Sequence, residues 1–189
     1  MKKIIKGDRD YLKKKRTRVI ILTIIYFVAA LSVFLIGYIT TGTKRNLLTV
    51  VAVLGLLPAC KSVVNMIMFL QAKGGSESAA SKIEEHAGRL ISMFDMYFTS
   101  YSKNFSVSHM VVDNKVVIGY TEDEKFDSKA FNEHIETMLK NAGHNIVTIS
   151  VTDNIDKYIE MLDNINKEAE PEHIEKDDEI RISLYEISL

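Results

Sequence analysis

Three charged residues in the second half of the chain have types and spacing that could do chemistry. Asp113 is followed ten residues later by Asp123, and Lys125 comes two positions after that. An acid followed by an acid-x-lysine pair can hold magnesium beside a lysine, because carboxylate oxygens are the ligands that Mg²⁺ prefers. The pattern is short, and its acids fall in sequence that predicts turns. Asp113, Asp123 and Lys125 are therefore a weak catalytic candidate.

The charge of this region is unfavourable for a nucleic-acid substrate. The whole chain has a net charge of -1, but the part from Gly74 onward has 11 basic and 23 acidic residues, a net charge of -12. Affinity for phosphate backbones comes mainly from clustered Lys and Arg. We therefore expect no nucleic-acid partner, and an enzyme or degenerate nuclease-like domain with a site near Asp113, Asp123 and Lys125 is kept as the alternative function.

Other catalytic and metal-binding patterns are missing from the sequence. The five histidines show no His-x-x-x-His spacing, and the single cysteine, Cys60, lies in an apolar run. A zinc site needs closely spaced Cys and His ligands. There is also no Gly-x-Ser-x-Gly and no dinucleotide fingerprint. The sequence predicts no cofactor and no metal.

Two long apolar runs separated by a short polar loop dominate the first 70 residues. Residues 19–40 contain no charge, and residues 47–70 contain one, Lys61. About 20 apolar residues are enough for a helix to cross the roughly 30 Å hydrocarbon core of a bilayer. The sequence therefore predicts a transmembrane helical hairpin over 19–70, with the lipid bilayer as a partner.

Basic residues are concentrated before the first span. Residues 1–18 contain nine Lys and Arg against two Asp, whereas the loop carries only Lys44 and Arg45. Basic residues are retained on the cytoplasmic side of a membrane. We expect 1–18 to be a basic cytoplasmic arm, and two spans return the C-terminal domain to the cytoplasm. The predicted location is the plasma (inner) membrane of a bacterium.

Small side chains recur along the second span. Ala52, Gly55, Ala59 and Ser62 follow one another at spacings of three, four and three, which places them on one helix face. Small faces let helix backbones approach closely in lipid. We expect this face to pack against the first span of the same chain, and packing against a second copy in a homo-oligomer is the alternative.

Lys61 is the residue of the second span that is hardest to place in a bilayer. It shares a face with Pro58 and Asn65, and a charge near the centre of a span costs roughly 2.5 to 3.5 kcal/mol on insertion scales. Either the helix bends and tilts until Lys61 reaches a carbonyl or a headgroup, or Lys61 and Asn65 contact another membrane protein. The sequence leaves both possibilities open.

A linker and a folded domain follow the second span. Residues 71–78, with Gly74 and Gly75 at their centre, predict a linker that does not couple the spans rigidly to the rest, because adjacent glycines raise chain entropy. Residues 79–169 predict a cytoplasmic α/β (α+β) domain, large enough for one core.

Apolar periodicity predicts the order α-β-β-α-β-α for this domain. A repeat of three and four over 78–102 indicates a helix, and 105–112 with 115–121 indicates a β-hairpin. Asp127 is expected to be the N-cap of the next helix, which Gly143 ends. The remaining predicted elements are a strand at 144–151 and a helix capped by Thr152 or Asp153.

The last twenty residues predict a charged linker and a terminal strand. Residues 170–179 are strongly acidic, and Ile180, Ile182 and Leu184 then alternate with polar residues. Alternation of this kind is typical of a strand. The predicted C-terminal strand at the end of 170–189 would pair with the sheet edge of its own domain, or alternatively with that of another chain.

Three segments resemble a family of small two-span membrane proteins from Gram-positive bacteria. They are residues 49–70, Ser-His-Met-Val-Val at 108–112, and Gly-Tyr-Thr-Glu at 119–122. Some members of that family carry a transferase-like label. The resemblance implies the two-span layout over nearly the whole chain, and it carries over no functional residues.

Taken together, these patterns predict a membrane-anchored cytoplasmic interaction or regulatory module. Its partner is expected to be a protein, or a second copy of the chain, bound through the membrane spans or the C-terminal strand.

Overall fold

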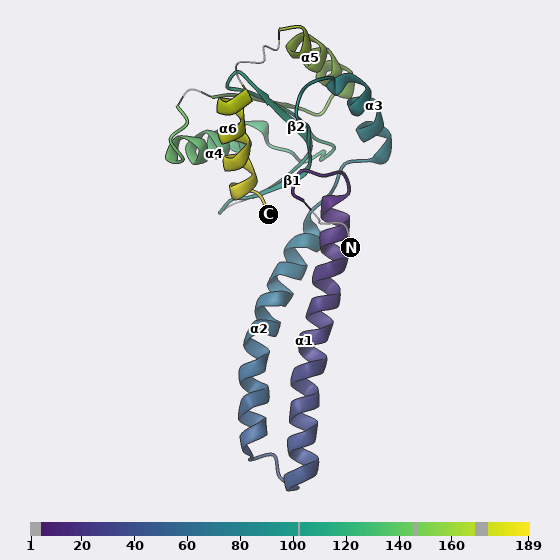
Figure 1. The fold of residues 1–189 in the computed structure, drawn as a ribbon, viewed down its shortest axis with the longest axis vertical. Helices are drawn as coiled ribbons and strands as arrows, with labels where there is room; N and C mark the ends of the chain where they lie inside the picture. The colour runs from purple at the N-terminus through teal and green to yellow at the C-terminus, as the bar shows by residue number, and fades with distance from the viewer. Residues whose placement is uncertain (1–4, 102, 146, 169–173) are drawn as a thin grey trace. The chain divides into compact units, whose positions relative to one another are not determined.

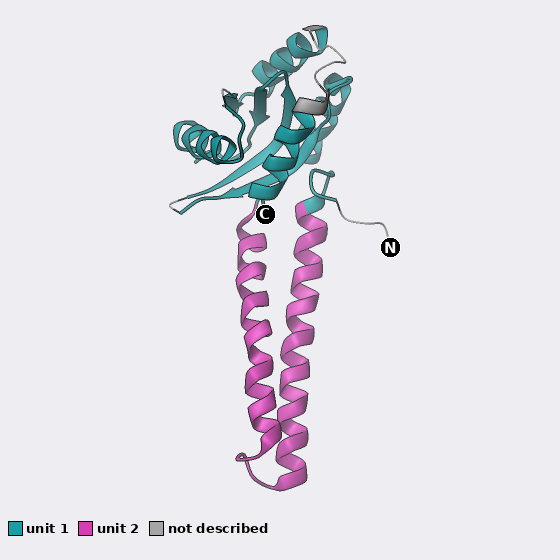
Figure 2. Ribbon diagram, turned by 60° about the vertical axis from the view of Figure 1, so that its left-hand side comes forward, with its two compact units in different colours: residues 1–11, 73–189 teal, residues 12–72 magenta. Residues whose placement is uncertain are grey.

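The computed structural model describes residues 5–101, 103–145, 147–168 and 174–189. The chain forms two compact units, coloured separately in Figure 2: Leu12–Ala72, and Met1–Tyr11 together with Lys73–Leu189. The first unit is a pair of long helices. The second is an α/β domain that includes the start of the chain.

Helices α1 (Tyr11–Thr41) and α2 (Leu47–Gln71) make up the first unit (Figure 1). Both are long and apolar enough to cross a membrane, and only 11% of the apolar window of each is buried. Core helices of soluble proteins are mostly buried, so this exposure fits an apolar solvent. The predicted helices at 19–40 and 47–70 are confirmed, whereas their crossing of a membrane stays a prediction.

The two helices contact each other through small side chains. Ala52, Ala59 and Ser62 of α2 are buried, and a Cβ added to Gly55 would lie 3.9 Å from the Cβ of Ala30 on α1. The small face of α2 therefore packs against α1 of the same chain, as the sequence predicts. Such residues allow the close backbone approach on which helix packing in lipid depends.

Two polar contacts join the helices at the other positions. The hydroxyls of Thr23 and Ser62 are 2.7 Å apart. Arg16 donates from Nε to the carbonyl of Phe69 at 2.9 Å and from Nη2 to the carbonyl of Ala72 at 2.6 Å. The last carbonyls of a helix lack intrahelical donors, so Arg16 caps the end of α2.

The beginning of α1 corrects one predicted boundary. The sequence places the basic arm at 1–18, but α1 begins at Tyr11. Residues 11–18 are therefore helical and continue directly into the apolar run.

A four-stranded mixed sheet forms the centre of the second unit. Its order is β1 (Met93–Thr99), β2 (Asn104–Asp113), β3 (Val116–Tyr120) and β4 (Thr148–Thr152). The β1/β2 and β2/β3 pairs are antiparallel, and β3/β4 is parallel. The predicted β2–β3 hairpin is confirmed, and β4 starts later than the predicted strand at 144–151.

Helices cover both faces of the sheet (Figure 1). On one face, α3 (Glu77–Ala87) and α5 (Ile155–Glu168) bury a core with β2 and β3. On the other, α4 (Ser128–Asn141) and α6 (Ile174–Ile187) bury a second core with all four strands. The largest fully buried side chains of the two cores are Ile83, Ile118, Tyr158 and Leu162 on the first face, and Met93, Phe98, Met110, Phe131, Ile135 and Leu139 on the second.

The predicted helix at 78–102 is wrong in its second half. Helix α3 ends at Ala87, Gly88 has a φ of 55°, and Met93–Thr99 is strand β1. Both faces of β1 are covered, so residues 93–98 are all buried. A strand buried on both sides has continuous apolar sequence, which matches a helical repeat as well as an alternating one.

The predicted C-terminal strand is also wrong, because residues 174–187 form helix α6. Ile180 and Leu184, four residues apart, are buried, whereas Ile182 is 56% exposed. The apolar residues follow a helical period, and the alternation at Ile182 is incidental. The acidic linker predicted at 170–179 is helical from residue 174, and residues 170–173 lie outside the described part of the chain.

Helix caps are predicted better than strands. Asp127 accepts a hydrogen bond from the N–H of Ala130 and caps α4, as expected, and Gly143 follows its end with a φ of 95°. The cap of α5 is Asn154, whose side chain accepts from the N–H of Lys157. Neither Thr152 nor Asp153 has that role.

Candidate functional site

The described N-terminal residues pack on the edge strand β1 of the second unit. The carbonyl of Gly7 accepts from the N–H of Phe94 at 2.8 Å, which forms an isolated antiparallel bridge. Gly7 has a φ of 84°, and a Cβ there would lie 2.5 Å from Oη of Tyr185. Only glycine combines this conformation with such a close approach.

Lys6 joins the same segment to the end of α6. Its Nζ donates to the carbonyls of Tyr185 and Ser188, both at 2.8 Å. These carbonyls lie in the last turn of the helix and just beyond it, where donors are missing and a cation is favourable. The C-terminal residues also close the β1 edge, since Ser188 bridges Phe98 and the N–H of Leu189 donates to Tyr97.

Arg9 binds one face of α3. Its guanidinium contacts Glu84 Oε2 at 2.9 Å, Glu77 Oε1 at 3.2 Å and Ser81 Oγ at 3.1 Å. A single exposed ion pair contributes little, but a fork shared by two carboxylates fixes geometry. Part of the basic arm is therefore bound to the acidic domain.

Gly74 and Gly75 fit closely against β1 and β2. The N–H of Gly75 donates to Asp95 Oδ1 at 3.1 Å. A Cβ on Gly74 would lie 2.8 Å from that same oxygen, and one on Gly75 would lie 2.8 Å from the Cβ of Ser108. The glycines serve close packing, so the prediction that this linker is not rigidly coupled is wrong for its link to the domain.

Asp95 holds an unusual backbone conformation at this point. It is 7% exposed and has a φ of 54°. The left-handed region costs roughly 1 to 2 kcal/mol for a residue with a Cβ. Observed strain of this kind concentrates at functional positions, and here it aims a carboxylate at the segment that arrives from α2.

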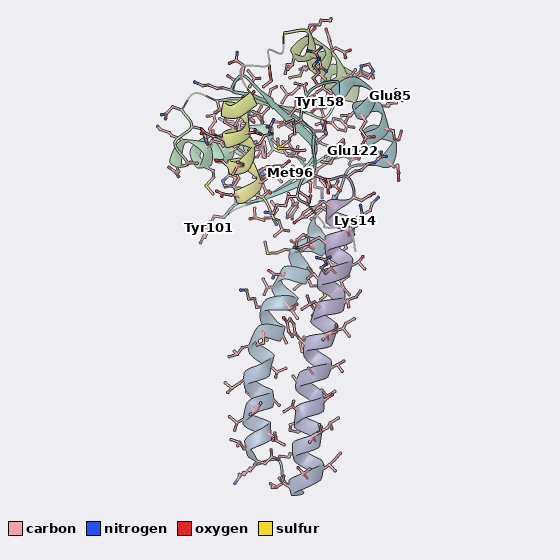
Figure 3. All side chains as sticks on the ribbon, in the orientation of Figure 1. Lys14, Glu85, Met96, Tyr101, Glu122 and Tyr158 are labelled. Carbon is pink, nitrogen blue, oxygen red and sulfur yellow. The ribbon has the colours of Figure 1, made fainter. Side chains whose placement is uncertain are left out.

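Glu122, in the loop after β3, binds the start of α3. Its carboxylate accepts from the N–H of Ser76 and from Ser76 Oγ, both at 2.7 Å, and Figure 3 shows it beside α3. A helix N-terminus favours a negative charge. The chain therefore supplies its own anion there.

We name this set of contacts the β1 edge junction. It joins both segments that flank the hairpin to β1, α3 and α6. Its polar members are Lys6, Arg9, Ser76, Glu77, Glu84, Asp95 and Glu122, together with the backbone of Gly7, Gly75 and Phe94.

The residues of the predicted catalytic candidate lie at opposite ends of β3. Asp113 pairs with Val116 at its start, whereas Asp123 and Lys125 follow its end at Tyr120. Five strand residues span about 17 Å. The structure does not bring Asp113 together with the other two.

Asp123 and Lys125 have local structural contacts. Asp123 Oδ1 accepts from the N–H of Lys125 at 3.3 Å and lies 4.0 Å from Nζ of Lys73. These contacts shape the turn before α4. Among the described residues, no group of three or more His, Cys, Asp or Glu side chains is placed to hold a metal ion.

The predicted membrane-interaction residues separate into two faces of α2. Ala52, Gly55, Ala59 and Ser62 face α1, as described above. Lys61 and Asn65 are exposed. The structure therefore accounts for the small residues within one chain and leaves the two polar ones at the surface of the hairpin.

Sequence analysis missed a buried polar pair, His109 on β2 and Tyr158 on α5. His109 Nδ1 and Tyr158 Oη are 2.7 Å apart, and both residues are 0% exposed. Burial lowers the pKa of His109 to about 3 and raises the pKa of Tyr158, so both are neutral at pH 7. His109 Nε2 has no hydrogen-bond partner in the described part of the chain. A substrate would not reach groups buried this deeply.

The faces of β2 explain why this pair was missed. The sequence groups His109 with Phe105 and Val107, but Val107 and Met110 share one core whereas His109 faces α5. The strand therefore changes phase between residues 107 and 110.

Comparison with known proteins adds no assignment: no model of a protein family, no curated protein and no solved structure matches this chain.

Proposed function

We propose that this chain is a membrane-anchored cytoplasmic module that binds or regulates another protein. The two apolar helices support the anchor, and the α/β domain supplies the surface that works in water. The observation that carries the proposal is the β1 edge junction, in which both segments flanking the hairpin are bonded to neighbouring residues of one strand, Phe94 and Asp95.

This attachment suits regulation because it couples the ends of the hairpin to the sheet. A hydrogen bond to a charged group contributes roughly 1.5 to 3 kcal/mol, and a neutral one about 1 kcal/mol. A displacement of either flanking segment by a membrane event would break bonds to β1. The strained carboxylate of Asp95 would then be released from Gly75.

Crosslinking in native membranes tests the proposal. Cells carrying the tagged full chain are treated with a short amine-reactive crosslinker, and the adducts are identified by mass spectrometry. We expect one dominant protein adduct, weakened by Asp95→Ala and unchanged by Glu160→Ala, a matched change on the exposed side of α5. Wild-type membranes without a protein adduct would overturn the proposal.

The cytoplasmic orientation has its own test. Thr43 in the loop and Ser78 on α3 are exposed, and each is replaced by cysteine in a Cys60→Ser background. A membrane-impermeant maleimide should label the loop cysteine, and not the α3 cysteine, on intact cells. The opposite pattern would refute the orientation. Ser76 is a poorer choice because its side chain caps α3 and binds Glu122.

The enzyme alternative is weakened by the distance between Asp113 and the turn that contains Asp123 and Lys125. Titration calorimetry of the full chain in detergent with magnesium or manganese separates the two functions. We expect no saturable heat. Saturable binding that Asp123→Asn removes would favour the alternative.

A further inference from the structure

Lys61 is exposed on α2 although the residues around it are apolar. No hydrogen bond or ion pair joins it to another residue in the described part of the chain. It lies ten residues before the end of α2 at Gln71, which is about 15 Å along the helix axis. In a bilayer this position is close to the midplane.

Two further polar groups lie on the same face. Asn65, four residues on, is exposed, and so is Pro58. Proline has no N–H, so the carbonyl of Leu54 lacks its intrahelical donor. With 100° per residue, residues 54, 58, 61 and 65 fall within a narrow stripe about 100° around the helix from the face that contacts α1. We name this stripe the Lys61 face.

Lipid does not satisfy the Lys61 face. Helical side chains point toward the helix N-terminus, which for Lys61 is away from the nearer end of α2. The ammonium group, the amide of Asn65 and the free carbonyl therefore stay within the hydrocarbon. Polar groups there are costly and pair with one another or with polar groups of a neighbouring helix.

A second copy of this chain does not satisfy the face either. Residues 19–71, which contain both apolar runs, include no Asp and no Glu. A symmetric contact would place Lys61 against Lys61, and any other contact between the spans would offer it no acid. Charge complementarity requires an acidic side chain from elsewhere.

We propose that the Lys61 face binds a transmembrane helix of a different membrane protein that carries an Asp or Glu within its span. The acid pairs with Lys61, and Asn65 and the carbonyl of Leu54 add hydrogen bonds across the interface. This inference rests on the proposed function and assigns its partner to the membrane.

Blue-native electrophoresis of the full chain, extracted from native membranes in mild detergent, tests the pairing. We compare wild type with Lys61→Leu, Lys61→Arg and Lys44→Leu, the last being the same change in the exposed loop. The wild type should run as a complex, and Lys61→Leu should lower the complexed fraction at least about tenfold. Lys61→Arg keeps the charge and should keep most of the complex, as should Lys44→Leu. Leucine inserts more readily than lysine, so the variant should accumulate normally.

A photoreactive residue at Leu57, which is 68% exposed and adjacent to Pro58, identifies the occupant. The expected adduct is a different membrane protein with an acid in its span. An adduct with a second copy, or with a span that lacks an acid, would overturn the inference. A wild-type complex that Lys61→Leu leaves intact would overturn it too, but the proposed function would stand. The absence of any complex or adduct would defeat both.

Discussion

The two units of this protein are held together by side chains of opposite size. The hairpin buries Ala30, Ala52 and Ala59 between its helices and exposes its large residues, such as Leu57 and Ile39. The α/β domain buries its large residues and exposes few of them. In water, stability comes from removing large apolar surfaces from solvent. In lipid that driving force is missing, and close backbone approach through small residues replaces it.

The difference shows that a residue's effect depends on the solvent of its unit. A large apolar residue should matter most in the domain when it is removed and most in the hairpin when it is added. Four predictions follow from this contrast, with expected effects from several kcal/mol to a few tenths.

Phe131 is expected to be the most sensitive of these positions. Its ring is 0% exposed and lies 5.4 Å from the rings of Phe98 and Phe105 and 5.1 Å from that of Phe126, between centroids. Phe131→Ala should lower the free energy of unfolding of the domain by about 3 to 5 kcal/mol. Urea unfolding of the full chain in micelles, followed by tyrosine fluorescence, measures it.

The matched control for Phe131 is Ile182→Ala on α6. Ile182 is 56% exposed, so its removal should change the free energy of unfolding by less than about 0.5 kcal/mol. Equal losses at the two positions would contradict the assigned core.

The buried His109 should make the domain sensitive to acid. Its pKa is about 3 in the folded protein and about 6.5 when unfolded. Between these values the unfolded state binds the proton and the folded state does not, so stability is full above pH 6.5 and falls as the pH drops toward 3. At pH 5 the loss is about 2 kcal/mol.

Urea unfolding at pH 7.5 and pH 5 measures that loss. His109→Gln can still bond Tyr158 but does not titrate, so it should flatten the pH dependence in this window whatever its own stability. A variant that keeps the full acid loss would show that other groups cause it.

Ala59 tests the opposite rule in the hairpin. It is 0% exposed at the helix contact, and Ala59→Leu should weaken the association of α1 with α2 by about 1 to 3 kcal/mol through overpacking. Leu57→Ala, at a 68% exposed position, should have little effect. SDS titration of the hairpin, followed by energy transfer between labels on the two helices, compares them. A stabilising leucine at position 59 would show that size, and not closeness, controls this contact.

The same contrast explains which parts of the fold sequence could predict. Span length, the polar loop and the small face of α2 follow from local composition, and the structure confirms the helices and their contact. In the domain, β1 and α6 were assigned to the wrong class. Both are decided by what covers them: β1 is buried on both faces, and α6 buries Ile180 and Leu184 while Ile182 points outward.

The β1 edge junction was beyond sequence analysis for a similar reason. Its members are separated by up to 182 residues, as in the bond from Lys6 to Ser188, and no local pattern links them. Gly74 and Gly75 were a usable signal, because paired glycines indicate close packing as well as flexibility. The left-handed Asp95 had no signal, since the strain depends on tertiary contacts.

The hydroxyl pair of Thr23 and Ser62 is the smallest of the four effects. Thr23 is 4% exposed and Ser62 is 8% exposed, and their oxygens are 2.7 Å apart. Hydrogen bonds between helices in membranes average about 0.6 kcal/mol, because separated helices find other partners for the same groups. Thr23 already donates to the carbonyl of Val19, which keeps it satisfied when Ser62 is removed. A double-mutant cycle of Thr23→Val and Ser62→Ala, measured by the SDS titration, should give a coupling near 0.6 kcal/mol. A coupling of 2 kcal/mol or more would mean that polar contacts, and not small residues, hold the hairpin together.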